Sequence, residues 1–368
     1  MKWFLFLLVT LHGLIHLLGF VKAFNLSPGT QLTQAISRPV GLLWLLAALL
    51  FAGGAIFFLI GREFWWIIVA PALIISQILI LTSWNDAKIG TIPNVIILVP
   101  LIYAYLNFQP SSFASRFRVE VQEGLKRSMQ QPPVLEEDIR HLPAPVQKYL
   151  KYAGVVGKPR VQNVRARFSG GIKPRLGGDF LGFVSQQYNF FDDPTRVFYI
   201  KSAMYGIPFD GLHLYKGPTA TMQIRIASLI QIVDAKGPEM NQGETVTLFN
   251  DMCMLAPARL IDRNIAWRSV DSLTVEAKYS NKGITITAML FFNDGGELIN
   301  FTSDDRFESA DGKTYNQYRW STPLANYRDI GGRRIASYGE TMWDTPEGKF
   351  TYGKFNLLEV EYNCTQRD

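Results

Sequence analysis

The sequence predicts an α+β protein, mainly antiparallel β, in which four transmembrane helices precede a strongly curved, half-barrel-like antiparallel sheet with a helical insert. Four long apolar runs open the chain, and short segments of alternating polarity fill the rest. Charge divides at the same place, because residues 1–108 hold five of the 37 Lys and Arg and two of the 31 Asp and Glu. We therefore expect a four-helix transmembrane region (1–108), a linker with a short amphipathic helix (109–135) and a curved β domain (136–368).

The first four elements follow from run length, because a transmembrane helix needs about 20 apolar residues. The first run occupies the position of a signal peptide, but it lacks an A-x-A-like cleavage site and three more spans follow it. We expect it to be retained, which makes the chain a multi-pass protein of the cytoplasmic membrane. The predicted spans are 3–21, 40–60, 64–83 and 91–108.

The first span contains an unusual stretch, "LHGLIHLLGF", with two of the four histidines of the chain. His12 and His16 are four residues apart and share one helix face. Ionisable residues inside a membrane are functional candidates, and paired histidines suit a metal, a haem edge or a proton path. Gln77 and Asn94 in later spans could instead hydrogen-bond to the rings. We predict polar packing between helices, with no metal and no cofactor.

The linker begins with a segment whose apolar residues recur every four positions, which predicts a short amphipathic helix. "QQPP" ends it. Such a helix could lie on the bilayer or dock on the following domain. Its apolar residues are Phe113, Phe117, Val121 and Leu125.

The β domain shows period-two alternation in segments such as "TMQIRI" and "GITITAMLFF", and "NDGGEL" is a strong hairpin turn. About five strands come before residues 238–261 and about six after. That segment has helical spacing, and Pro257 ends or interrupts it. A sheet of about ten strands must curl or close, so we expect the helix to cross the open side. The concave face then either fills with side chains or holds an apolar ligand.

The apolar face is the best candidate for a binding site, because Met and aromatic side chains suit an adaptable lipid site. The alternative for each residue is a place in a filled core. The candidates are Phe198, Ile200, Met204, Met222, Ile224, Ile226, Ile286 and Leu290.

Catalytic motifs offer less. The sequence has no nucleotide-binding loop, G-x-S-x-G, H-E-x-x-H or zinc cysteine set. Glu239, Glu244 and Asp251 on the helical insert could do acid–base chemistry if they are buried, or could form a solvated face. His213 near Asp210 could pair with it, or could be an ordinary strand histidine. An enzyme with Glu239 and His213 as first suspects is therefore an alternative to a binding protein.

Several stretches resemble one bacterial family of unknown function: "LPAPVQKYLKYAGVVGKPRV", "VDAKGPEMNQGETVTLFNDMCMLAPARLI", "IAWRSVDSLTVEAKY", "DGGELINFTSDDRF" and "YRDIGGRRIASYGETMW". They run in order over about residues 135 to 363. The family brings no established activity or site residues. The strand–helix–strand order also resembles the half-barrel of lipoprotein carriers of the LolA/LppX type, which hold lipid chains outside the cytoplasm. That resemblance implies a lipid-handling domain.

Charge and cysteines add limits. The net charge of residues 109–368 is about +3, too small to favour nucleic acid. Cys253 and Cys364 permit one disulfide or two buried thiols. Basic residues near membrane spans favour the cytoplasmic side, but here they are divided almost equally between the two sides of the membrane. Arg116 and Arg118 slightly favour a cytoplasmic position for the β domain. The carrier resemblance implies the extracytoplasmic side, and we expect that side.

The expected partners are membrane lipids and a lipid, another apolar ligand or a lipidated partner, and no oligomeric state follows from the sequence. A third hypothesis is a structural or assembly role in the cell envelope, with the helices as the working half.

Overall fold

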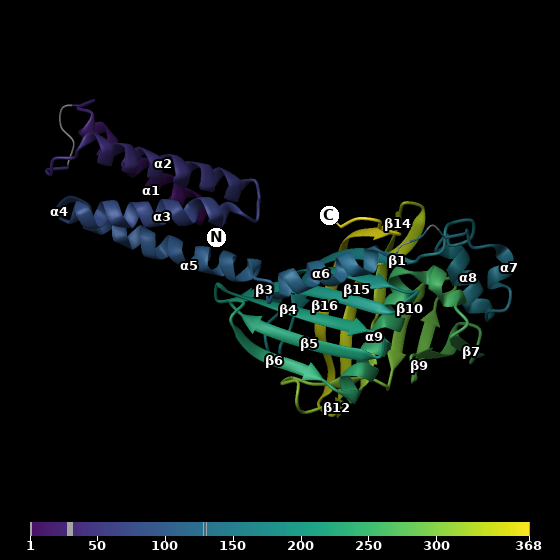
Figure 1. The fold of residues 1–368 in the computed structure, drawn as a ribbon. Helices are drawn as coiled ribbons and strands as arrows, with labels where there is room; N and C mark the ends of the chain where they lie inside the picture. Colours follow the sequence, from purple (N-terminus) through teal and green to yellow (C-terminus); the bar gives the residue numbers. More distant parts are fainter. Residues whose placement is uncertain (1, 28–31, 128, 130, 368) are drawn as a thin grey trace. The chain divides into compact units, whose positions relative to one another are not determined.

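The computed structural model describes residues 2–27, 32–127, 129 and 131–367, and it divides into two compact units. Unit 1 is Met1–Gln109 and unit 2 is Pro110–Asp368. Unit 1 consists of helices, whereas unit 2 is mainly β-sheet (Figure 1). The prediction of four apolar helices followed by a curved antiparallel sheet with a helical insert is confirmed.

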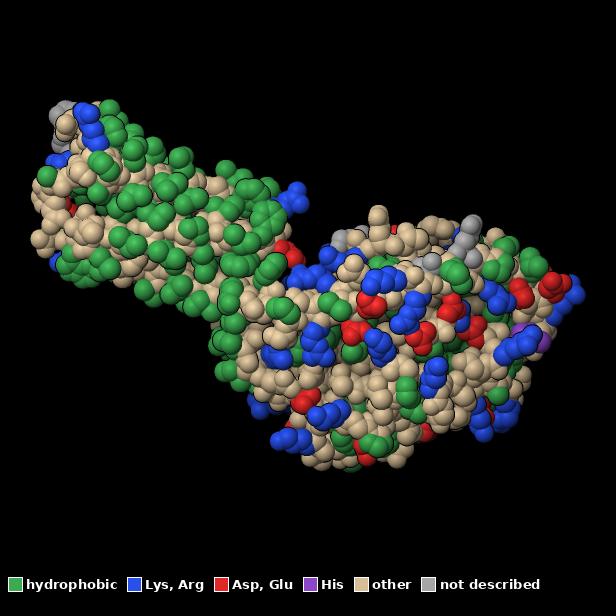
Figure 2. All heavy atoms as spheres, in the orientation of Figure 1, with side chains coloured by type: hydrophobic (Ala, Val, Ile, Leu, Met, Phe, Trp, Pro, Cys, Tyr) green, Lys and Arg blue, Asp and Glu red, His purple; other side chains and the backbone are tan. Residues whose placement is uncertain are grey.

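Within the described residues, unit 1 has four helical stretches that are long and apolar enough to cross a membrane. Hydrophobic side chains cover the surface of this unit that Figure 2 shows, as expected for helices facing lipid. Pro71 and Pro100 lie inside helices, where packing in a membrane tolerates them. The helices are α1 (Lys2–Ala23), α2 (Arg38–Leu59), α3 (Trp65–Thr82), α4 (Trp84–Ala87), η1 (Lys88–Gly90) and α5 (Thr91–Phe108).

Close contact between α1 and α2 depends on small residues. A Cβ atom at Gly19 would lie 2.2 Å from the ring of Trp44, and one at Gly13 would lie 2.7 Å from Cβ of Phe51. These glycines let the aromatic rings of α2 approach the backbone of α1, which is the usual way that membrane helices gain packing.

Unit 2 is built on a 14-stranded antiparallel sheet. Its order is β6-β5-β4-β3-β2-β1-β16-β15-β13-β10-β9-β8-β7, and β14 also pairs with β15. The first strands are β1 (Asn163–Ile172), β2 (Leu181–Phe190), β3 (Thr195–Met204), β4 (Ile207–Lys216), β5 (Thr219–Ile226) and β6 (Ile230–Lys236). The later strands are β7 (Ile265–Ser269), β8 (Thr274–Asn281), β9 (Ile284–Phe292), β10 (Leu298–Ser303), β13 (Arg319–Ser321), β14 (Leu324–Ile330), β15 (Arg333–Thr345) and β16 (Gly348–Tyr362), with β11 (Phe307–Glu308) and β12 (Asn316–Gln317) forming a separate pair.

The sheet curves around one helix. Helix α9 (Pro238–Leu255), followed by the short η2 (Pro257–Ile261), joins the first six strands to the rest. It contacts strands in both halves of the sheet, from β4, β5 and β6 to β9, β10 and β15, which requires strong curvature (Figure 1). Between Gly243 and Leu255 almost every residue of α9 is buried, so the helix fills the concave side over part of its area.

Three further helices lie against the sheet: α6 (Phe113–Leu125), α7 (Glu136–Ile139) and α8 (Ala144–Tyr152). Helix α6 packs on the outer face, where its four apolar residues contact β2, β3 and β4. Of the two arrangements expected for the linker helix, the structure shows docking on the domain. Tyr149 of α8 donates a hydrogen bond from its hydroxyl to the carbonyl of Cys253, at 2.7 Å, which ties α8 to α9. Cys253 and Cys364 are both buried free thiols.

Candidate functional site

The inner face of the sheet is defined by alternation along β3. Val197 and Tyr199 pack against α6 on the outer face, whereas Phe198 and Ile200 belong to the main core inside. Antiparallel register carries the same face across β4 and β5, because Phe198 lies opposite His213 and His213 opposite Met222. The candidate residues on these three strands therefore share one surface.

The eight predicted residues fall into two groups. Ile286 and Leu290 lie on β9 in the other half of the sheet and are fully buried. Six lie on β3 and β5, where Phe198 and Ile200 are almost fully buried. The remaining four are partly or largely exposed: Met204, Met222, Ile224 and Ile226.

Met204, Ile224 and Ile226 lie toward the end of β3, β4 and β5 that is remote from Glu244 of α9, and Met222, opposite His213, borders it; we call this the uncovered end. Ile224 is opposite Gly211, and Ile226 is opposite Phe209. A Cβ atom at Gly211 would lie 2.9 Å from Cγ2 of Ile200, so this glycine leaves room for the isoleucine. The result is an apolar inner surface of branched and Met side chains that remains in part accessible.

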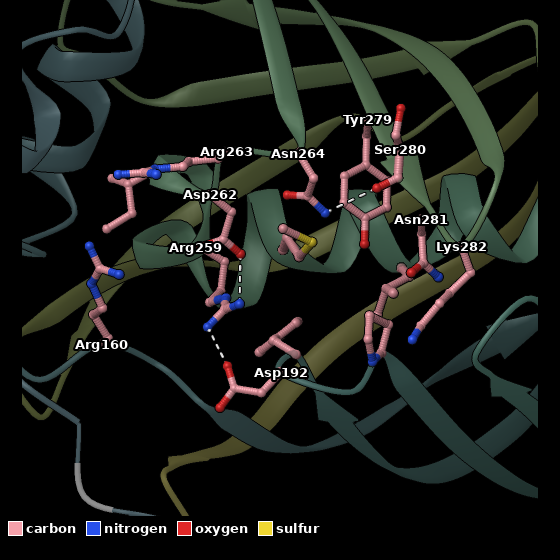
Figure 3. A pocket seen from close by; sticks show the side chains of 15 residues that line it. Arg160, Asp192, Arg259, Asp262, Arg263, Asn264, Tyr279, Ser280, Asn281 and Lys282 are labelled. Atoms are coloured by element: carbon pink, nitrogen blue, oxygen red, sulfur yellow. Dashed lines mark hydrogen bonds and ion pairs between the residues drawn. The ribbon is translucent and has the colours of Figure 1, made fainter.

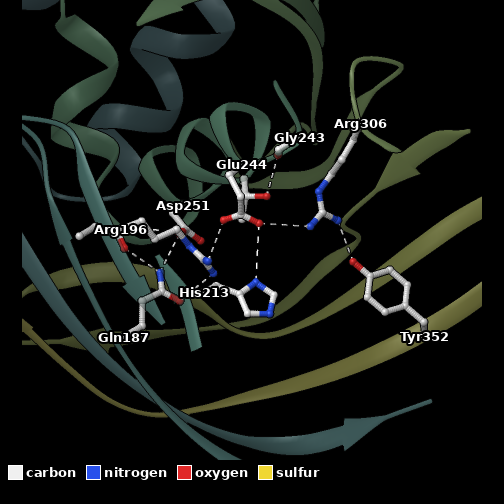
Figure 4. A network of polar contacts seen from close by, with 10 residues as sticks. Gln187, Arg196, His213, Gly243, Glu244, Asp251, Arg306 and Tyr352 are labelled. Atoms are coloured by element: carbon white, nitrogen blue, oxygen red, sulfur yellow. Dashed lines mark hydrogen bonds and ion pairs between the residues drawn. The ribbon is translucent and has the colours of Figure 1, made fainter. Parts of the chain in front are cut away.

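The other end of the same strands, the covered end, carries a buried polar network under α9 (Figure 4). Arg196 of β3 donates from Nε to Oδ2 of Asp251 at 2.7 Å and from Nη1 to Oε2 of Glu244 at 3.1 Å. All three side chains are at least nine-tenths buried. Gln187 and Asn189 of β2 donate to the same Asp251 oxygen at 2.7 and 2.9 Å. The network thus fastens α9 to β2 and β3.

The second oxygen of Glu244 faces two more groups. Its Oε1 lies 3.7 Å from Nδ1 of His213 and 3.8 Å from Nη2 of Arg306. Arg306 also donates from Nη1 to the hydroxyl of Tyr352 at 2.8 Å. Burial alone would raise the pKa of Glu244, but Arg196, together with His213 and Arg306, has the larger, opposite effect. The pKa is therefore lowered, to about 2. Glu244 is therefore a carboxylate held ionised inside the protein.

His213 connects the network to the uncovered end. Burial lowers the pKa of its imidazole, although Glu244 acts in the opposite direction, so the ring is neutral near pH 7. Its side chain keeps 20% of its surface exposed, beside Phe198 and opposite Met222. At 3.7 Å from Oε1 of Glu244, Nδ1 of His213 is within ion-pair distance but farther away than in a normal hydrogen bond.

Sequence reasoning found His213 but attached it to the wrong carboxylates. Glu239 is outside the network, and Asp210 lies on the outer face, where it accepts from Ser228. Glu244 and Asp251 are seven residues apart, two helical turns, so they share one face of α9. This seven-residue spacing was the feature of the sequence that could have indicated a pair of carboxylates on one face of the helix. Their partner Arg196 is 48 and 55 residues away in the chain, and only the fold brings it there.

A polar cavity of about 690 Å³ lies between the turn before β3 and the end of β8 (Figure 3). Leu248 and Met252 of α9 belong to its lining. Arg259 projects into it and is paired with Asp192 and Asp262 at 3.1 and 2.7 Å. This charged lining does not suit an apolar ligand. A second cavity, also about 690 Å³, surrounds Phe180 on the outer face of β1 and β2.

In unit 1 the structure brings His12, His16, Gln77 and Asn94 together. His12 Nε2 lies 2.8 Å from Oδ1 of Asn94, and Asn94 donates from Nδ2 to Oε1 of Gln77 at 3.0 Å. His16 Nε2 lies 2.9 Å from the hydroxyl of Ser76, a residue that sequence reasoning missed. In the described part of the chain, no group of three or more His, Cys, Asp and Glu could hold a metal ion.

The sequence profile of a family of unknown function, DUF6544, matches residues 132–355. The chain belongs to this family. The match covers α9 and all but the last residues of the sheet, so the family is defined by unit 2 without the apolar helices. No curated protein matches the sequence.

Solved structures give weak likenesses. One is described as a putative outer membrane lipoprotein-sorting protein domain from Vibrio parahaemolyticus, with 11% identity, coverage of 56% of this chain and 87% of the other, and a TM-score of 0.33. A DUF1329 family protein from Desulfovibrio piger has 12% identity, coverage of 61% and 94%, and a TM-score of 0.37. A LolA superfamily protein from Nitrosomonas europaea has 11% identity, coverage of 61% and 94%, and a TM-score of 0.32. Scores this low carry no argument about function.

Proposed function

We propose that unit 2 of this DUF6544 protein binds a lipid, another apolar molecule or the lipid chain of a partner on the uncovered end of its inner face, without catalysis. One observation carries the proposal. Met204, Met222, Ile224 and Ile226 line the concave face of the sheet as Phe198 and Ile200 do, yet they are only partly buried or exposed, whereas Phe198 and Ile200 are almost fully buried. A sheet that needed only a filled core would cover them.

The chemistry of the surface supports an acyl chain. Branched aliphatic residues give area, and methionines adapt to the shape of a flexible ligand. Each methylene group transferred from water is worth about 0.8 kcal/mol, so ten buried methylenes supply roughly 8 kcal/mol before the costs of ordering the ligand. The surface therefore has no need of charged groups for affinity.

The polar network at the covered end favours entry of a ligand from the uncovered end. Arg196, Glu244 and Asp251 hold α9 in place by hydrogen bonds of 2.7 and 3.1 Å. Breaking such buried pairs costs about 3–5 kcal/mol, so α9 is not a convenient lid. A ligand would enter from the uncovered end and stop near His213.

We place unit 2 on the extracytoplasmic side of the cytoplasmic membrane, as the resemblance of the sequence to lipoprotein carriers implies. A reporter fused after Asp368 tests this placement. Activity of an extracytoplasmic reporter is the expected result, and activity only of a cytoplasmic reporter would overturn the placement.

Photocrosslinking tests binding in the full chain. The protein in nanodiscs is loaded with a diazirine-bearing fatty acid, irradiated and digested, and crosslinked peptides are identified by mass spectrometry. We expect saturable crosslinks in residues 198–226 that excess unlabelled fatty acid removes. Ile224→Asp should reduce them at least tenfold, because it places a charge on the apolar surface.

The matched control is Ile299→Asp, at an exposed isoleucine of β10 outside the proposed surface. It should leave the crosslinks unchanged. Crosslinks confined to the four apolar helices, or equal loss in the two variants, would overturn the proposal.

A further inference from the structure

Three hairpin turns lie along one end of the sheet. They join β1 to β2 (173–180), β3 to β4 (205–206) and β5 to β6 (227–229). Because the strands are antiparallel neighbours, these turns fall at the same end, which is also the uncovered end of the inner face. We call residues 173–180, 204–207 and 226–230 the turn edge.

The turn edge is unusually apolar for exposed turns. Hairpin turns in water are normally Gly, Asn, Asp, Ser and Pro. Here Tyr205 is 98% exposed, Leu229 is 61% exposed and Ile230 is 63% exposed. Leu176 and Ile207 are each more than half exposed as well. Large apolar side chains gathered at the tips of three turns indicate an apolar partner.

Four cations lie on or near the turn edge. Lys173 lies 4.6 Å from the ring centroid of Phe180, and Lys354 lies 5.1 Å from it. Arg175 and Arg225 lie on or beside the first and third turns, and the carboxylate among the turn residues is Asp179. Exposed apolar and aromatic side chains with Lys and Arg near them suit the interface of an anionic bilayer, where each cation near the surface contributes about 1 kcal/mol.

Chain length limits how far the turn edge can be from the membrane. Arg225, next to the third turn, donates from Nη1 to the carbonyl of Ser111 at 3.0 Å, and its guanidinium lies 4.3 Å over the ring of Phe113. Helix α5 ends at Phe108. Three residues span at most about 11 Å. If α5 crosses the bilayer, the covalent chain keeps Ser111 within that distance of the end of α5, and the hydrogen bond holds Arg225 to Ser111.

We propose that the turn edge is a bilayer-docking surface: its apolar tips enter the interfacial layer of the membrane that holds the four helices, and its cations contact anionic headgroups. The occupant is the lipid bilayer itself. The inference does not rest on ligand binding to the inner face. Docking would nevertheless turn the uncovered end toward the lipid from which a ligand would come.

Depth-dependent quenching tests the proposal in the full chain. Tyr205→Cys is labelled with the fluorophore NBD and reconstituted in nanodiscs that contain phosphatidylglycerol and lipids with a nitroxide at the top of the acyl chain. The two native cysteines are buried, and labelling of the unsubstituted chain sets the background. The expected result is a blue shift and at least twofold quenching at position 205.

The matched control is Pro218→Cys, in the turn at the opposite end of β4. A ten-residue strand separates the two turns by about 30 Å. The label at 218 should remain unquenched, with the emission of an aqueous fluorophore. Equal quenching or equal absence of quenching at 205 and 218 would overturn the proposal.

A second pair of variants separates lipid from a protein partner. With the label at 205, Leu229→Asp combined with Ile230→Asp should reduce quenching at least twofold, because charges resist entry into the apolar layer. Val270→Asp, at an exposed apolar residue between β7 and β8, should not. Quenching that persists in the double variant would overturn insertion of the turn edge. A signal that needs an added membrane extract would assign the surface to a protein instead.

Discussion

The two ends of the inner face use the same strands for opposite purposes. At the covered end, β3 supplies Arg196, which is buried with two carboxylates of α9. A few residues along, the same strand supplies Met204, which is 44% exposed. The difference lies in what faces each end. Helix α9 covers polar groups that hold it in place, whereas apolar groups such as Met204 stay partly exposed.

This comparison separates stability from function. A buried ion pair adds little net stability over apolar residues of the same size, but it fixes geometry because neither partner can be left alone. Half-exposed apolar side chains give up part of the transfer free energy that full burial would provide. The polar groups of the covered end fix the helix, and the apolar groups of the uncovered end are the ones for which we propose ligand binding.

The largest expected effect comes from breaking the covered end. Arg196→Met leaves Glu244 and Asp251 buried without their cation, so it should lower the free energy of unfolding of unit 2 by about 3–5 kcal/mol. Hydrogen exchange of peptides from residues 135–363, measured by mass spectrometry on the full chain, reports this loss.

Arg268→Met is the control, because Arg268 pairs with Glu276 at 2.6 Å on the surface with 64% of its side chain exposed. It should cost less than about 1 kcal/mol. Similar losses in the two arginine variants would contradict the distinction between the two ends.

A paired truncation compares the ends directly. Ile286→Ala removes a fully buried side chain of β9 and should cost about 2–5 kcal/mol. Ile224→Ala removes a partly exposed one at the uncovered end and should cost about 1 kcal/mol or less. Guanidinium unfolding followed by near-ultraviolet circular dichroism measures both. Equal costs would mean that the uncovered end is ordinary core.

Acid should remove the contribution of Glu244 to the stability of the covered end, whereas burial raises the pKa of Asp251, which acts in the opposite direction. The pKa of Glu244 falls from an ordinary value of 4.5 to about 2 in the folded protein, so its stabilisation is complete above pH 4.5 and is lost as the pH falls toward 2. The whole difference is worth roughly 3 kcal/mol. Since burial also lowers the pKa of His213, the unfolded chain takes up that proton first, which adds to the loss below pH 6.5.

Thermal unfolding between pH 7 and 3 measures this dependence. Glu244→Gln should be less stable at pH 7 and lose less on acidification than the wild type. Glu361→Gln, at an exposed carboxylate, should keep the wild-type profile. Parallel profiles for all three proteins would show that Glu244 is not held ionised.

The smallest effect is expected in unit 1, whose buried polar cluster contains no ion pair. Replacing His12 and His16 by Leu removes interhelical contacts worth about 0.6 kcal/mol each. The helices should unfold at a slightly lower denaturant concentration in detergent, and hydrogen exchange of unit 2 should not change. Loss of a bound metal or chromophore, or unfolding of unit 2, would contradict a packing role.

Local patterns account for the elements. Apolar runs of membrane length predict helices wherever they lie, and alternation in "GITITAMLFF" predicts the strand that becomes β9. Both signals depend on neighbours in the chain. The amphipathic spacing of Phe113, Phe117, Val121 and Leu125 likewise predicts α6 but not the surface that it covers, because a helix with one apolar face can bury it against lipid or protein.

The sequence did not predict which apolar residues would be buried and which would stay exposed. Ile200 and Ile224 both have the pattern of apolar strand residues, yet Ile200 is almost fully buried and Ile224 only partly. Ser76 carried no signal, because a serine in an apolar helix usually bonds to its own backbone. Its place beside His16 depends on how α1 and α3 pack.

The sequence by itself therefore determined the division into apolar helices and β domain, the strands and the crossing helix, since each is encoded in residue type and period along the chain. The tertiary structure alone decided that Glu244 and Asp251 meet Arg196, and that the inner face is covered at one end and open at the other. The physical reason is that burial and charge pairing are properties of three-dimensional neighbours. Curvature brings together strands and a helix that are some 50 residues apart, and no local pattern records that distance.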